Sequence, residues 1–370
     1  MNDPLSRLVS LGRLSRTAWG DRGQLKWLQY HNVDVAYVGW VNRSNLGDEA
    51  MFRLQRSLLA GRVMLPIPLD RKTTRLVTVA HPHVRFVLIG GGTLLGRDGW
   101  LRKVVSIRER MQVGEVVVLG AGMEEPSFGI DRGITSEAGL MHWASLLSEA
   151  KFVGVRGPRT QQNLAELGVR SQVVGDPALS IQLPDANPGD SIAPDNSRPI
   201  VAVNVASVVD GYAKGSTRHY SGLSAALTDL SRNGAVLKLF AMERGDMQLA
   251  RRVFPGFPPG AFPRRRQTLD DVLLLIRSAA LVISERLHGG ILSANVGTPF
   301  LLLGYKPKCY DFVESICHSG ALLPINEIEA QELARVAASR IELEALPDTV
   351  RKEIITLRSD FRAAHSAALS

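Results

Sequence analysis

The chain has 370 residues and a formal net charge of +8, with 45% hydrophobic and 22% charged side chains. This composition is typical of a globular protein with room for two domains, and no apolar run reaches the roughly 18 residues that a membrane span needs. The two cysteines lie outside any metal-binding spacing, which argues against structural zinc and against a disulfide framework. We therefore expect a cytoplasmic protein without a metal.

The positive charge predicts an anionic partner: nucleic acid, lipid headgroups or a phosphorylated substrate. Nucleic acid is disfavoured, because the basic residues are scattered and no recognition motif for it is present. Basic residues among leucines at residues 5–26 fit an amphipathic helix on the anionic inner face of the membrane, and equally a helix packed on its own domain. The oligomeric state stays open.

The first half of the chain alternates apolar runs with helical stretches. Expected strands lie at residues 33–39, 84–89, 115–120, 152–156 and 171–174, and expected helices at residues 48–59, 100–111, 142–150 and 158–167. Alternation of this kind predicts βαβ units with right-handed crossovers, a parallel sheet, and helices on both of its faces.

Three turns in this half follow expected strands and are candidates for lining a site. Asn45 and Asp48 belong to the first, and they either face a ligand or simply cap the following helix. Gly91 and Gly92 allow close approach of the backbone to a ligand, but a tight turn with positive φ explains them nearly as well. Asp176 could contact hydroxyl groups of an acceptor, although an Asp-Pro turn is the better explanation.

A stretch rich in proline, glycine and polar residues interrupts the pattern at residues 184–199 and predicts a linker. A second alternating series follows, with expected strands at residues 200–205, 235–240, 279–283 and 299–303. We therefore expect a first Rossmann-like domain at residues 1–183 and a second at residues 200–326. The tail, residues 327–370, fits two helices interrupted at Pro347 that pack back on both domains.

The most informative cluster lies at the junction between the strand at residues 279–283 and the helix after it. Arg286 and His288 fall where a helix N-terminus offers free N–H groups to an anion. Lys308 follows His288 by 20 positions, which fits one helix and one strand, so it can return to the same sheet edge. Glu285 is either a second acid or the partner of Arg286. Such a cluster suits a small, multiply charged anion.

These residues, together with the segments at residues 45–50, 90–93, 155–160 and 175–178, resemble the polysaccharide pyruvyl transferase family in their order and spacing. The resemblance implies a GT-B-like fold of two Rossmann-like domains with parallel sheets and an active site in the cleft between them. It also places the family's Arg, His and Lys that handle phosphoenolpyruvate on Arg156, His288 and Lys308. With Arg286 as a candidate third cation, the expected donor site consists of Arg156, Arg286, Leu287, His288 and Lys308. Two glycines, Gly157 and Gly289, stand where family members often have Asp and Ala.

The activity that the resemblance implies is transfer of pyruvyl from phosphoenolpyruvate to a hydroxyl pair of a sugar, forming a ketal on a surface polysaccharide or its lipid-linked precursor. No cofactor is implied. His288 is the candidate acid, because its ordinary pKa lies near the working pH. It can instead contact the phosphate, or be a core histidine satisfied by a backbone carbonyl.

Two other functions stay open. One is a sugar-nucleotide glycosyltransferase on the same fold. The other is a non-catalytic scaffold for polysaccharide assembly that keeps the anion pocket.

Overall fold

The computed structural model describes residues 33–370 apart from residues 42–43, 60, 68–73, 76, 79–80, 185–197, 208–210 and 213–216. The basic segment at residues 5–26 and nearly all of the predicted linker lie outside the described residues. Two compact units make up the chain: one extends to Pro177 and includes Ser359–Ser370, and the other is Ala178–Arg358. The predicted domain limits, residues 1–183, 200–326 and 327–370, stay predictions.

The first unit is built on a parallel sheet in the order β2-β1-β3-β5-β6-β7, with β4 paired to β5. Its strands are β1 (Val35–Val38), β2 (Met64–Pro66), β3 (His83–Gly90), β4 (Thr93–Leu95), β5 (Gln112–Met123), β6 (Phe152–Val155) and β7 (Gln172–Val173). The central strands β1, β3 and β5 bury nearly continuous apolar runs, as expected for a parallel sheet covered on both faces.

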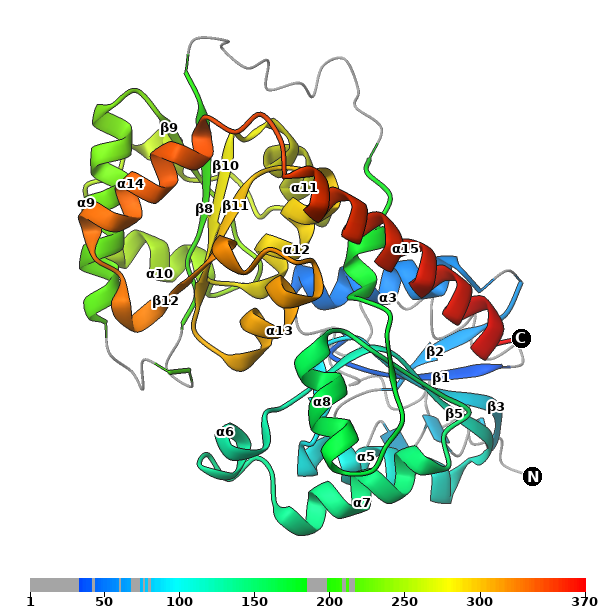
Figure 1. Cartoon of the computed structure of the whole chain (residues 1–370). Coiled ribbons are helices and arrows are strands. Elements are labelled where there is room, and N and C mark those ends of the chain that lie inside the picture. Colours follow the sequence, from blue (N-terminus) through cyan, green and yellow to red (C-terminus); the bar gives the residue numbers. More distant parts are fainter. Residues whose placement is uncertain are drawn as a thin grey trace. The chain divides into compact units, whose positions relative to one another are not determined.

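Helices cover both faces of this first sheet. The α-helices that begin in this unit include α3 (Leu46–Ser57), α5 (Asp98–Arg110), α6 (Pro126–Ile130), α7 (Glu137–Ser148) and α8 (Pro158–Glu166). α5 and α7 pack on each other, and α3 lies on the opposite side of the sheet (Figure 1). Ser136 starts α7 by accepting a hydrogen bond from the Gly139 N–H, which satisfies one of the free donors at the helix start.

The second unit contains a parallel sheet in the order β12-β11-β10-β8-β9. Its strands are β8 (Ile200–Asn204), β9 (Val236–Leu239), β10 (Leu281–Ser284), β11 (Phe300–Gly304) and β12 (Leu322–Pro324). β8, β10 and β11 are completely buried. Together with the helices they enclose a second hydrophobic core of valine, leucine and phenylalanine side chains.

The helices of the second unit are α9 (Arg218–Arg232), α10 (Asp246–Val253), α11 (Leu269–Ser278), α12 (Leu287–Val296), α13 (Pro307–Ser315), α14 (Ala330–Ile341) and the first half of α15 (Asp348–Ala368). α9 packs on α14 and α10, whereas α12 contacts both α11 and α13 on the opposite side of the sheet (Figure 1). A capping box between Thr268 and Asp271 starts α11, and left-handed Gly297 ends α12.

Candidate functional site

The strand order of the second sheet points to one edge as the place for a ligand. From β8 the chain moves to β9 on one side, and then crosses back to β10 on the other side. The switch point therefore lies between the carboxyl ends of β8 and β10, where ligands of open α/β sheets characteristically bind. β8 ends at Asn204 and β10 ends at Ser284, and these two residues face each other in the strand register.

Asn204 ties together the chain segments at this switch point. Its Oδ1 accepts hydrogen bonds from the Arg286 N–H at 3.2 Å and from the Ser284 hydroxyl at 3.3 Å. Its Nδ2 donates to the Phe240 carbonyl at 3.1 Å and to Asp246 Oδ2 at 3.2 Å. Because the Asn204 amide is fully buried and both its oxygen and its nitrogen are hydrogen-bonded, it fixes the position of the backbone at Arg286.

The guanidinium of Arg286 is held by two carboxylates. Its Nη2 lies 2.8 Å from Asp246 Oδ1 and 2.7 Å from Glu243 Oε2. Burial by itself lowers the pKa of Arg286, but the two carboxylates outweigh burial and raise the pKa above its ordinary value. Arg286 is thus a permanent cation whose charge is already balanced within the protein.

Glu285 lies in different surroundings from its neighbour Arg286. Its Oε2 accepts a hydrogen bond of 2.5 Å from the Ala206 N–H, and its Oε1 lies 3.1 Å from His219 Nε2, within ion-pair distance. Burial raises the pKa of this carboxyl, and the contacts with His219 and Ala206 oppose the rise only in part. The ion pairs of Arg286 run to Asp246 and Glu243, not to Glu285, so the predicted pairing of Glu285 with Arg286 is not the arrangement observed.

The first turn of α12 follows directly. Leu287 is buried in the core, so it can meet a ligand only through its backbone, whereas His288 is half-buried. A Cβ at Gly289 would lie 2.1 Å from the Ser284 hydroxyl. Glycine is therefore required at position 289 to let α12 begin so close to the end of β10.

Lys308 reaches the same sheet edge from the neighbouring strand. β11 lies beside β10 in parallel register, and α13 begins just after it, with Pro307 as its first residue. The Lys308 Nζ is 5.2 Å from the centre of the Tyr305 ring, and the same tyrosine adds a small contribution to the raised pKa of Arg286. The structure thus brings Glu285, Arg286, Leu287, His288 and Lys308 together at one edge of the second sheet.

The remaining predicted site residues belong to the first unit. The Asn45 side chain accepts hydrogen bonds from the N–H groups of Gly47 and Asp48, as the capping explanation requires. Gly91 and Gly92 have φ values of 65° and 76°, as the tight-turn explanation requires. A Cβ at Gly92 would lie 3.7 Å from Asp48 Oδ1, so this turn and the start of α3 are adjacent. They flank the switch point of the first sheet, between β1 and β3.

Arg156 and Asp176 are buried at the carboxyl ends of β6 and β7, with exposed fractions of 1% and 2%. The Arg156 guanidinium lies against Gly122, where a Cβ would come within 2.3 Å of Nη2. Tyr37 donates a hydrogen bond to the Gly90 carbonyl, and burial together with the Asp48 and Asp176 carboxylates raises the pKa of Tyr37. Arg156, Asp48 and Asp176 therefore belong to one edge of the first sheet.

Sequence reasoning missed the residues that hold the cluster in the second unit: Asn204, His219, Glu243, Asp246 and Tyr305. Asn204 could have been found from the sequence, because it is a polar residue near the end of an otherwise apolar expected strand at residues 200–205. Across the part of the chain that the structure describes, no group of three or more His, Cys, Asp or Glu side chains is arranged to hold a metal ion.

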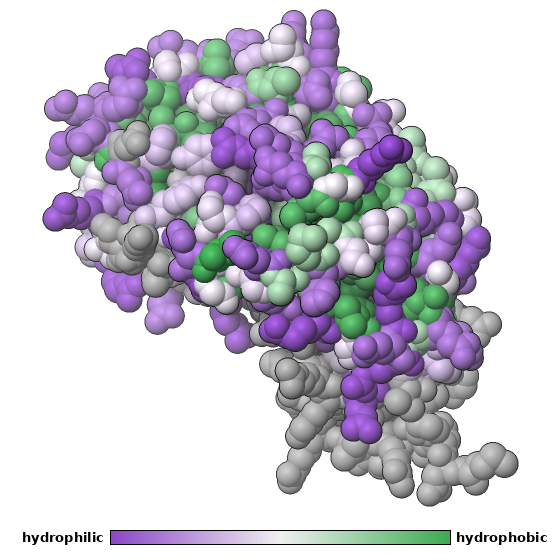
Figure 2. Space-filling model, turned by 60° about the horizontal axis from the view of Figure 1, so that its bottom comes forward, coloured by the Kyte–Doolittle hydropathy of each residue, from purple (hydrophilic) through white to green (hydrophobic). Residues whose placement is uncertain are grey.

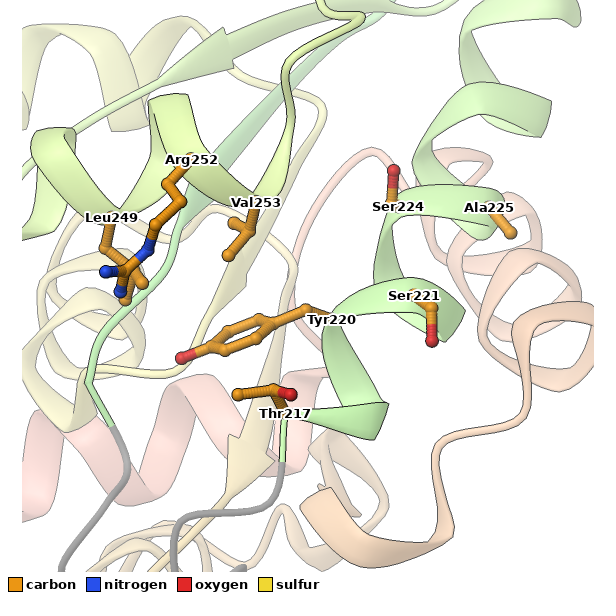
Figure 3. Close-up of a pocket in the computed structure, with 8 residues that line it drawn as sticks. All are labelled: Thr217, Tyr220, Ser221, Ser224, Ala225, Leu249, Arg252 and Val253. Atoms are coloured by element: carbon orange, nitrogen blue, oxygen red, sulfur yellow. The ribbon is translucent and has the colours of Figure 1, made fainter.

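An open groove lies on the second unit between α9 and α10, and none of the predicted site residues lines it. Its walls are formed by Thr217, Tyr220, Ser221, Ser224, Ala225, Leu249, Arg252 and Val253 (Figure 3). The Tyr220 hydroxyl donates to the Ala206 carbonyl at 2.7 Å, which links the groove to the backbone that Glu285 holds. The groove contains none of the cations that the sequence predicts for an anion site.

The molecular surface is predominantly hydrophilic in the view of Figure 2, where apolar areas are interspersed among polar ones. None of the described helices combines the length and apolar character of a membrane span.

Comparisons with known proteins give the family and the fold. The sequence model of the polysaccharide pyruvyl transferase family matches residues 45–307. The match ends one residue before Lys308, so the place of Lys308 in the site rests on the geometry of α13. A search of curated protein sequences finds no match.

Solved structures resemble the chain at low sequence identity. UDP-GlcNAc 2-epimerase from Methanocaldococcus jannaschii aligns with a TM-score of 0.56 and 11% identity, over 89% of this chain and 98% of that one. The Neisseria meningitidis enzyme bound to UDP-GlcNAc aligns with a TM-score of 0.55 and 10% identity, over 91% and 99%. Such identities show the fold alone, and they confirm the predicted GT-B-like class with two parallel sheets. Since the family match covers well over half of the sequence, this chain belongs to the polysaccharide pyruvyl transferase family.

Proposed function

We propose that this protein transfers the pyruvyl group of phosphoenolpyruvate to two hydroxyl groups of a sugar, as a ketal. The observation that supports the proposal is that α12, which carries His288, and α13, which carries Lys308, begin at the carboxyl ends of the adjacent strands β10 and β11, where Arg286 also lies. Family membership supports the transferase activity.

The donor needs cations for a carboxylate and a phosphate, and an acid for its methylene carbon. Helix N-termini and a lysine suit the anionic groups, because free N–H groups and a point charge stabilise them without a metal. We assign Lys308, the backbone at the start of α12, and Arg156 to this task. Arg286 is the third cation of the cluster: Asp246 holds it in place, and before a ligand binds Asp246 and Glu243 together balance its charge.

The proposed chemistry begins with a proton passing from His288 to C3 of phosphoenolpyruvate. C2 becomes electron-poor, and the first sugar hydroxyl adds to it and loses its proton. The bond between C2 and the phosphate oxygen then breaks, and the second hydroxyl closes the ketal and gives up its own proton. The proton from His288 stays on the new methyl group, one of the two hydroxyl protons restores His288, and the other leaves with inorganic phosphate.

The acceptor that we propose is a sugar of a surface polysaccharide or its lipid-linked precursor at the inner face of the membrane. Asp48 and Asp176, at the edge of the first sheet, are the proposed contacts for its hydroxyl groups, because carboxylates accept hydrogen bonds from sugar hydroxyls.

Thermal unfolding with candidate donors tests this assignment. A ligand that binds only the folded state raises the unfolding midpoint by mass action, so phosphoenolpyruvate should raise it more than UDP- or GDP-sugars at equal concentration. Strong stabilisation by a sugar nucleotide, with none by phosphoenolpyruvate, would favour a glycosyltransferase instead.

Enzymatic turnover should persist in excess chelator, because the proposed site stabilises the phosphate without a divalent ion.

A further inference from the structure

The two carboxylates on Arg286 are fixed to very different degrees. Asp246 has a side-chain exposure of 1%, and its Oδ2 accepts hydrogen bonds from the N–H groups of Met242 and Glu243 and from Asn204 Nδ2. Glu243 precedes α10 in a turn, and its side-chain exposure is 34%. Asp246 therefore cannot leave Arg286 without leaving buried donors unsatisfied, whereas water already reaches about a third of the Glu243 side chain and can replace Arg286 as its partner.

Both carboxylates reach the same nitrogen of Arg286, at 2.8 Å and 2.7 Å. The Arg286 side chain is 18% exposed, so part of it remains accessible. The guanidinium and its two carboxylates together carry a net negative charge, which repels an approaching anion. An anion can therefore bind to Arg286 only if it replaces Glu243, the carboxylate that can move.

We infer that Glu243 is an internal competitor for the anion site: it occupies the accessible side of Arg286 and must be displaced when an anionic ligand binds. Asp246 is the positioning residue that keeps the guanidinium oriented through the exchange. The identity of the ligand as phosphoenolpyruvate rests on the proposed function, but the competition applies to any small anion that carries a carboxylate or a phosphate.

We predict that removal of the negative charge of Glu243 increases the affinity of the protein for the anion. Glu243→Gln and Glu243→Ala should bind phosphoenolpyruvate about two- to fivefold more tightly than the wild type, the size expected for one partly exposed competing charge. Asp246→Asn should bind it more weakly, because Arg286 loses its fixed partner. Glu332→Gln is the matched control, since Glu332 pairs with Arg335 on the exposed face of α14 at the same 2.7 Å separation.

Calorimetric titration with phosphoenolpyruvate and, separately, with inorganic phosphate gives the readout, and thermal unfolding verifies that each variant is folded. Tighter binding in the two Glu243 variants, with an unchanged Glu332→Gln protein, supports the inference. Equal or weaker binding in folded Glu243 variants overturns it.

The two anions separate this inference from the donor assignment. If inorganic phosphate binds more tightly to the Glu243 variants while phosphoenolpyruvate binds to none of the proteins, the competition stands and the proposed donor is wrong. If neither anion binds to any variant, the competition is overturned as well.

Discussion

At the scale of single residues, adjacent positions after β10 serve different purposes. Arg286 joins the carboxylates of Asp246 and Glu243, while Glu285 turns to the Ala206 N–H and to His219. Successive side chains of an extended backbone point to opposite sides, so the two charged neighbours cannot share one partner easily. The sequence predicted that both residues lie at the junction, but the partners of Arg286 come from 40 residues or more upstream and only the fold reveals them.

His288 is the residue on which the proposed chemistry depends. If it protonates C3, His288→Ala should lower the single-turnover rate by roughly 10²–10⁴-fold with little change in donor affinity. Lys308→Ala should weaken donor binding as well, because it removes a charge facing an anion. His142→Ala, at an exposed position of α7, is the control and should behave as the wild type.

Rapid-quench rates and calorimetric affinities distinguish the two roles of the imidazole. A His288→Ala protein that turns over normally when saturated with donor would show that His288 only contacts the phosphate. Glu285, whose pKa is raised by burial, would then be the next acid to examine.

At the scale of elements, the site exists because two helices begin at one sheet edge. β10 and β11 are adjacent and parallel, so α12 and α13 start side by side. Sequence spacing was sufficient to predict this, because the lengths of one helix and one strand add up to the separation of His288 and Lys308. The short strands β2, β4 and β12 were not predicted: each has three residues, and β2 and β12 are edge strands that end in proline.

The close start of α12 gives a prediction about Gly289. In Gly289→Ala the new methyl group would collide with Ser284, whose hydroxyl donates to the Arg286 carbonyl at 2.8 Å. We expect a loss of about 1–3 kcal/mol in the free energy of unfolding, as for other overpacked cores. Weaker anion binding should accompany the loss, since Arg286 moves with Ser284.

Chemical denaturation measures this loss of stability, and two further variants serve as comparisons. Ser284→Gly in the same chain removes the two Ser284 atoms with which the methyl group would clash, and it should recover part of the stability. Gly99→Ala, in the first turn of α5, adds a methyl group where no atom lies within 4 Å and should be neutral or slightly stabilising. A Gly289→Ala protein as stable as Gly99→Ala would show that α12 packs less tightly than described.

At the scale of the whole molecule, two parallel sheets each carry candidate residues at the switch point of their strand order. Alternating apolar and helical segments were enough to predict this class of fold, because parallel strands bury long apolar runs. Whether the two sets of residues act on one substrate in a cleft between the domains remains a prediction.

Acid should destabilise both units, because each contains a buried histidine. Burial lowers the pKa of His365 in the first unit to about 4, and burial together with Arg340 lowers that of His318 in the second to about 4. In the unfolded chain both histidines have their ordinary pKa of 6.5. Above pH 6.5 they are neutral in both states and do not affect the free energy of unfolding. As pH falls from 6.5 toward 4 only the unfolded state takes up the protons, so the free energy of unfolding decreases.

The replacement of both residues by glutamine tests this account. The unfolding midpoint of the wild type should fall more steeply between about pH 7 and about pH 5 than that of the double variant. An identical slope in both proteins would mean that other groups control the acid sensitivity. His142→Gln again serves as the exposed control.

The central claim is that phosphoenolpyruvate is the donor and that its C3 takes up a proton. The most direct measurement is a reaction in D₂O with phosphoenolpyruvate and a panel of lipid-linked sugars, followed by mass and NMR spectroscopy of the product. We predict a sugar that has gained pyruvate less one water, one inorganic phosphate for each ketal, and a methyl group carrying one deuterium. A product without the added pyruvyl group, or a pyruvyl ketal with no deuterium in its methyl group, would contradict the account.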